Sequence, residues 1–105
     1  MSVRVIALKT PRTFWSQHGD AEQALLAWHD EVSQARWKQP ADTKAQYRSA
    51  GILKNRRVVF NIKGNDYRLV VALAFNTELV FVKFIGTHKA YDAIDAETVE
   101  PEWLQ

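Results

Sequence analysis

The chain has 105 residues, a length typical of one domain, and 47% of them are apolar, which is enough for a modest core. It contains no cysteine, which excludes disulfides, a thiolate zinc site and a cysteine nucleophile, and this composition is usual for cytoplasmic domains. No long apolar run follows the first residues, so we expect neither a signal peptide nor a membrane-spanning helix.

The net charge of +2 is unevenly distributed along the chain. Residues 36–68 hold nine lysines and arginines against two aspartates, a local charge of +7. Residues 88–105 hold one lysine against five carboxylates, a local charge of −4. The basic middle is typical of a polyanion-binding surface and favours nucleic acid as its ligand. The alternative is a solvated surface on which the middle and the tail pair with each other.

A short strand and two helices are expected in the first forty residues. The strand covers residues 3–8, and a helix follows from Thr10, a good N-cap before a proline, to Gly19. Asp20 then begins an amphipathic helix of roughly 17 residues, because its apolar residues recur at helical spacing. Pro40 ends this helical region.

The second half of the chain changes to strands. We expect an irregular segment with a short helix at 42–47. From Arg56 onward apolar residues recur with a period of two, which predicts β-strands. Tight turns at 63–66 and 76–78 separate three such strands, so we expect an antiparallel meander.

These elements predict an α+β fold. The N-terminal strand and two helices pack on one face of the antiparallel meander, and a short C-terminal helix follows it. The other face of the sheet can then face water. Arg68 and Lys83 each lie within a strand between apolar neighbours, which is costly unless the cation reaches water, a partner or a ligand. If Arg57 shares their face, a row of cations leads to His88.

The stretch from residue 80 to residue 94 joins the last strand to a short helix. We expect Gly86 to end the strand and Thr87 to cap a helix that begins at His88. This junction would deliver His88 and Tyr91 to one edge of the sheet, where such side chains can move protons and hold an anion. The alternative is a simple connection with ordinary polar surface residues.

We expect no metal ion and no cofactor. The three histidines lack metal-ligand spacing, and no cysteine supports them. The chain has neither a Walker loop nor a GxGxxG motif, and no helix follows its one glycine-containing turn.

Two motifs carry a family resemblance: RVVFNIKGNDYRLV at 57–70 and FIGTHKAYDAID at 84–95. In this order and spacing, the chain resembles the HigB-type toxins of bacterial toxin–antitoxin pairs, members of the RelE/ParE superfamily. The segment 14–42 is also similar, so the resemblance covers one domain, with 99–105 as a peripheral tail. Ala90 departs from the pattern, because many relatives have an acidic residue there.

The resemblance implies a RelE-like fold and a metal-independent endoribonuclease that cuts translated messenger RNA in the ribosomal A site. It also implies neutralisation by a HigA-type antitoxin with a helix-turn-helix domain. Operator DNA would be bound only through the toxin–antitoxin complex. A cytoplasmic protein with no membrane partner is expected.

The resemblance also suggests roles for individual residues. The RNA 2′-hydroxyl would attack the adjacent phosphorus, with a base to remove its proton and an acid to protonate the leaving 5′-oxygen. Arg68 would clamp the scissile phosphate, His88 would be the general acid or base, and Tyr91 would orient the nucleotide or share the proton transfer. Arg57 is a second candidate for stabilising transition-state charge. Five further cations would hold the RNA backbone or ribosomal RNA: Lys54, Arg56, Lys63, Lys83 and Lys89.

Each role has an alternative. Arg68 could pair with Asp66 or a tail carboxylate, His88 could only begin the last helix, and Tyr91 could pack on the sheet. Two other function classes are also open, a ParE-like poison of a topoisomerase and a noncatalytic RNA- or ribosome-binding module.

Overall fold

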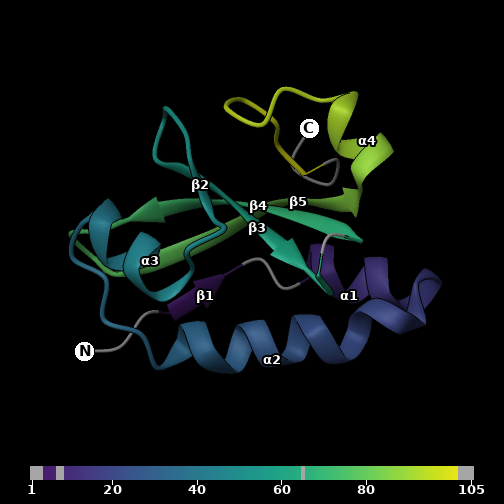
Figure 1. The fold of residues 1–105 in the computed structure, drawn as a ribbon, viewed down its shortest axis with the longest axis horizontal. Coiled ribbons are helices and arrows are strands. Elements are labelled where there is room, and N and C mark those ends of the chain that lie inside the picture. The colour runs from purple at the N-terminus through teal and green to yellow at the C-terminus, as the bar shows by residue number, and fades with distance from the viewer. Residues whose placement is uncertain (1–3, 7–8, 65, 102–105) are drawn as a thin grey trace.

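The computed structural model describes residues 4–6, 9–64 and 66–101 as an α+β fold, which confirms the predicted fold class. A five-stranded sheet forms the middle layer, with α1 and α2 on one face and α4 with the C-terminal segment on the other (Figure 1). The elements in chain order are β1 (Arg4–Ile6), α1 (Lys9–Gln17), the 3-10 turn η1 (Gly19–Ala21), α2 (Glu22–Ser33), α3 (Pro40–Gln46), β2 (Gly51–Ile52), β3 (Arg57–Ile62), β4 (Tyr67–Ala74), β5 (Leu79–Thr87) and α4 (His88–Asp92).

The strand order is β1-β5-β4-β3-β2, with the expected antiparallel meander β3-β4-β5 at its centre. The N-terminal strand β1 does not pack on a face of the meander, as predicted, but joins the sheet and pairs in parallel with β5 at one edge. The two-residue strand β2, which the sequence did not predict, pairs antiparallel with β3 at the other edge. None of the helices in the described part of the chain is long and apolar enough to cross a membrane.

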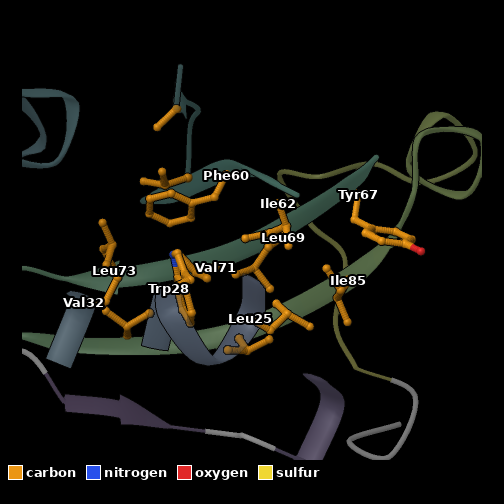
Figure 2. Packing of buried hydrophobic residues seen from close by; sticks show 14 of the residues in the cluster. Leu25, Trp28, Val32, Phe60, Ile62, Tyr67, Leu69, Val71, Leu73 and Ile85 are labelled. Atoms are coloured by element: carbon orange, nitrogen blue, oxygen red, sulfur yellow. The ribbon is translucent and has the colours of Figure 1, made fainter. Parts of the chain in front are cut away.

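The face of the sheet that α1 and α2 cover is called the first face. The main core lies between α2 and this face. Trp28 of α2 is 4% exposed, and its ring meets Phe60 of β3 edge to face with centroids 5.5 Å apart. Buried aromatic pairs of this kind contribute about 0.5–1.5 kcal/mol beyond the area that they bury. Figure 2 shows the residues that face one another here: Leu25, Trp28 and Val32 of α2 with Phe60, Leu69 and Val71 of the sheet.

The helix α2 ends at Ser33, so the predicted amphipathic helix of roughly 17 residues was too long. After Ser33 the chain turns back to the core, where Trp37 is 2% exposed and its ring lies 6.2 Å from that of Phe60. Contrary to the prediction, Pro40 does not end α2; it begins α3, because proline suits the first turn of a helix. Aromatic burial therefore overrides the helical pattern.

A β-bulge in β5 determines which cations share a face. Val70 pairs with Phe84 and Val71 pairs with Val82, so Lys83 is the extra residue in the strand. As a result, Lys83 lies on the second face of the sheet, the face away from α1 and α2. Arg57 and Arg68 also lie on this face, because their register partners Ala72 and Gly86 alternate with the core-facing residues. The row of cations that the sequence left conditional is therefore present.

The second face is not open to water, contrary to the expectation from the sequence. Residues 93–101, here called the C-terminal strap, cross this face after α4 (Figure 1). Ala96 of the strap packs with Val59 and Val70 in a small apolar cluster that also includes Val99. The acidic tail thus lies against the basic middle, which confirms one part of the pairing alternative.

Candidate active site

The junction between β5 and α4 builds the candidate site. Gly86 does not end the strand as predicted, because β5 continues to Thr87 and Gly86 pairs with Arg68. A Cβ atom at position 86 would lie 2.7 Å from the Phe84 ring and 3.2 Å from Cβ of Ala90, so glycine allows α4 to approach the sheet. Thr87 caps α4 as predicted, since its hydroxyl accepts the N–H of Ala90 at 3.2 Å.

Arg68, His88 and Tyr91 come together at this junction. Nε of Arg68 donates to Nε2 of His88 at 3.3 Å. This contact requires Nε2 to be unprotonated, so the proton of a neutral His88 ring lies on Nδ1. The guanidinium carbon of Arg68 lies 5.3 Å from the centroid of the Tyr91 ring, within the range of a cation–π contact. All three side chains are half-buried.

The charge of Arg68 is not neutralised within the described part of the chain. Its sequence neighbour Asp66 lies 3.6 Å from Lys63, and the tail carboxylate of Glu100 pairs with two other cations. No ion pair involves Arg68 among residues 4–6, 9–64 and 66–101. The half-buried guanidinium can hold an anion, and the acceptor nitrogen of His88 and the phenol of Tyr91 beside it can transfer a proton.

Arg57, Lys83 and Arg68 lie on the second face of the sheet, called the cationic face from here on. Arg57 lies at the end away from Arg68, and its partners belong to the protein itself. Its side chain is 7% exposed, its Nη2 lies 3.0 Å from Glu100, and its Nη1 donates to the Val99 carbonyl at 2.6 Å. Lys83 joins this group, since its Nζ lies 2.7 Å from the other oxygen of Glu100. Hydrogen bonding to Lys83, with its charge and that of Arg57, lowers the pKa of Glu100.

The four remaining predicted RNA-binding cations are exposed and divide between two ends of β3. Lys63 and Lys89 lie at the end near Arg68, where Lys63 also pairs with Asp20 at 2.9 Å. Hydrogen bonds from Tyr67 and Lys63 lower the pKa of Asp20. Lys54 and Arg56 precede β3 at its opposite end. The structure therefore does not bring these cations to one point, and Lys63 reaches toward Asp20 of η1 and not toward the cationic face.

Asn61 is a site neighbour that the sequence reasoning missed. It lies directly opposite Arg68 in the register of β3 and β4 and therefore on the same face. Its Oδ1 is buried and has no hydrogen-bond partner among the described residues. Counting back from the tight turn after Ile62 would have paired these two positions, because a hairpin turn fixes the register.

The described residues include no group of three or more histidines, aspartates or glutamates placed to hold a metal ion. The chemistry that the cluster itself offers is anion binding by Arg68 with proton transfer at His88. Tyr91 adds an aromatic ring and a hydroxyl beside them.

The sheet, the helices on its first face and the short helix after its last strand form a RelE-like fold. The family model of the HigB toxin, described as the RelE-like toxic component of a toxin–antitoxin system, matches residues 21–94. The chain belongs to this family, which confirms the resemblance seen in its two motifs. The matched residues include the whole candidate cluster and end before most of the strap.

Three curated relatives of the chain also carry the name HigB. The chain is 29% identical over 92 residues to the mRNA interferase toxin HigB of Escherichia coli (strain K12). Proteins named mRNA interferase HigB from Escherichia coli O157:H7 and Shigella flexneri show the same identity over the same length. In each case the alignment covers 86% of this chain and 86% of the relative.

Proposed function

We propose that this chain is an mRNA interferase, an endoribonuclease toxin whose catalytic residues are Arg68, His88 and Tyr91. One observation carries the proposal: the guanidinium of Arg68 lies against an unprotonated nitrogen of His88 and over the Tyr91 ring. The names of the three relatives support the reaction, and membership in the toxin family supports the biological role.

The proposed reaction uses the RNA strand's own nucleophile. The 2′-hydroxyl attacks the adjacent phosphorus, so a bond from O2′ to phosphorus forms and the bond from phosphorus to O5′ breaks. The products are a 2′,3′-cyclic phosphate and a 5′-hydroxyl. His88 Nε2 takes the proton of the 2′-hydroxyl, since it is already an acceptor in the free chain. Tyr91 orients the nucleotide, and its hydroxyl donates the proton that O5′ takes as the bond to phosphorus breaks. The tyrosine is then reprotonated from water, and His88 releases its proton to water.

Arg68 changes partner during this reaction. In the free chain its Nε is bound to His88. A phosphate oxygen is a stronger acceptor for a guanidinium than a neutral imidazole, because the hydrogen bond then joins two opposite charges. Substrate binding therefore draws Arg68 to the phosphate and frees His88 Nε2 for the proton. The positive charge also stabilises the negative charge that grows on the phosphorane oxygens.

As a toxin of this family, the chain acts with an antitoxin and targets messenger RNA. The finer partners are proposals. We propose a HigA-type antitoxin with a helix-turn-helix domain, cleavage of translated messages in the ribosomal A site, and contact with operator DNA only through the antitoxin complex. We also propose that the chain works in the cytoplasm as one domain, with Lys54, Arg56, Lys63 and Lys89 holding RNA at the edges of the site.

The test is to induce the chain in cells and to map the 5′ ends of a reporter message with and without its start codon. We expect cleavage between codons that disappears when the start codon is removed. Intact messages with normal translation would refute the nuclease. DNA damage without RNA cleavage would indicate a topoisomerase poison, and salt-sensitive RNA binding without cleavage would indicate a noncatalytic module.

A further inference from the structure

One carboxylate of the C-terminal strap bridges two cations on neighbouring parts of the sheet. The two oxygens of Glu100 lie 3.0 Å from Nη2 of Arg57 and 2.7 Å from Nζ of Lys83. Arg57 comes from β3 and Lys83 is the bulged residue of β5. Two cations separated by more than twenty residues thus converge on one anionic group.

The environment of these cations explains why they need an anion. The side chains of Arg57 and Lys83 are 7% and 17% exposed, so water compensates little of their charge. The Glu100 side chain is 39% exposed and can turn into water without unfolding the strand that carries either cation. The cations are therefore fixed in the sheet, whereas their anion is exchangeable.

A phosphodiester matches this site in charge and shape. It carries one negative charge shared by two oxygens on one central atom, as the Glu100 carboxylate does, and an arginine beside a lysine is a suitable partner for it. Lys83 is next to Phe84, which pairs with Val70 of the neighbouring strand. Val70 is two residues from Arg68 along β4. Two residues of a strand span ~7 Å, so one RNA strand can reach both Lys83 and Arg68.

We propose that Arg57 and Lys83 form a second phosphate subsite, which Glu100 occupies in the free chain and a phosphodiester of bound RNA occupies after Glu100 turns away. The inference rests on the proposed ribonuclease function and adds to it a competitor for RNA. The match to the family model ends at residue 94. Both cations lie within the matched residues, whereas Glu100 lies in the strap beyond them. The strap therefore lowers the affinity of the free chain for RNA.

The test compares RNA binding by the full-length wild type and by Glu100→Gln. The glutamine keeps the size of the side chain and removes its charge. The probe is a short fluorescent 2′-O-methyl RNA, which has no free 2′-hydroxyl and is not cleaved. We expect Glu100→Gln to bind about tenfold more tightly, since one charge-assisted contact of about 1.4 kcal/mol is gained. The slope of log affinity against log salt should steepen by about 0.7 per phosphate gained.

Asp30→Asn is the matched control. It also removes one negative charge, but from an exposed position on α2, on the first face of the sheet. The double variant Glu100→Gln/Lys83→Gln should lose most of the gain, because it lacks one cation of the subsite. Equal gains in Asp30→Asn and Glu100→Gln would reflect net charge alone and overturn the subsite. An unchanged affinity and salt slope in Glu100→Gln would overturn it as well.

The subsite and the proposed function fail in different ways. Cleavage of the reporter message by the wild type, with no tighter binding by Glu100→Gln, refutes only the subsite. Tighter binding by Glu100→Gln, with no cleavage by any variant, leaves the subsite and refutes the nuclease.

Discussion

The two ends of the cationic face hold the same residue type in opposite circumstances. Arg57 is almost fully buried, donates to the Val99 carbonyl and pairs with Glu100. Arg68 is half-buried and contacts His88 and Tyr91, with no ion pair among the residues that the structure describes. Both arginines lie on the same face of the same hairpin. The difference arises from where the C-terminal strap crosses the sheet.

This difference separates stability from chemistry. A guanidinium that is paired within the fold contributes to stability, and removing it leaves its partners unsatisfied. A guanidinium without a carboxylate partner keeps its charge available for a ligand, which is the arrangement typical of a functional site. Substitutions at the two ends should therefore affect different measurements.

The largest effect is expected for His88→Ala. Loss of a general base or acid typically lowers a rate by about 10²–10⁴-fold. Cleavage of a reporter message in a reconstituted translation reaction should fall by this factor, while the thermal unfolding of the chain changes little, because Thr87 still caps α4. His88→Gln preserves a polar side chain and serves as the control for local structure. Activity within threefold of wild type in both variants would remove His88 from the site.

Arg68→Ala should lower the same cleavage rate by about 10²–10³-fold, the usual loss for one group that stabilises transition-state charge. Its free energy of unfolding should stay close to that of the wild type, since the described residues give it no ion pair to lose. Arg68→Lys keeps the charge without the planar fork and should recover only part of the rate. Arg12→Ala, at an exposed arginine on α1, is the matched control and should cleave normally.

Arg57→Ala should show the reverse balance: a clear loss of stability, with cleavage lowered only as far as RNA binding weakens at the second phosphate subsite. Removing this guanidinium leaves the Val99 carbonyl without its donor and leaves Glu100 with Lys83 as its remaining cation. Hydrogen bonds to charged groups contribute about 1.5–3 kcal/mol, so we expect the free energy of unfolding to fall by about 2 kcal/mol. Urea denaturation measures it directly, with Arg12→Ala again as the control. Unchanged stability together with complete loss of cleavage would erase the distinction between the two ends.

Much of the fold could be predicted from the sequence, because local patterns determine it. Alternation of apolar residues identified β3, β4 and the faces on which Phe60 and Leu69 lie, and Thr87 marked the start of α4. The early end of α2 could not be predicted in this way. It depends on Trp37 returning to the core, a tertiary contact that local helical periodicity does not contain.

The candidate site was predicted in part for similar reasons. Family resemblance and residue chemistry identified Arg68, His88 and Tyr91, which the fold brings together. Simple alternation would not settle the face of Lys83, because the bulge shifts the parity of β5 by one residue. Glu100, the partner of Arg57, lies in the strap more than forty residues away along the chain. The negative net charge of the tail was the one sequence feature that indicated such a contact.

The smallest effect concerns the pH dependence of the strap. Lys83 and Arg57 hold the pKa of Glu100 below its ordinary value of 4.5, so in acid the unfolded chain binds this proton more readily than the folded chain. The stabilisation by Glu100 is therefore complete above pH 4.5 and is lost as the pH falls through the lowered pKa. Because the side chain is 39% exposed, we expect less than about 1 kcal/mol. The difference in free energy of unfolding between wild type and Glu100→Gln should shrink from pH 7 toward pH 3. A difference that stays constant over this range, while Asp30→Asn resembles the wild type, would show that the charge of Glu100 does not hold the strap.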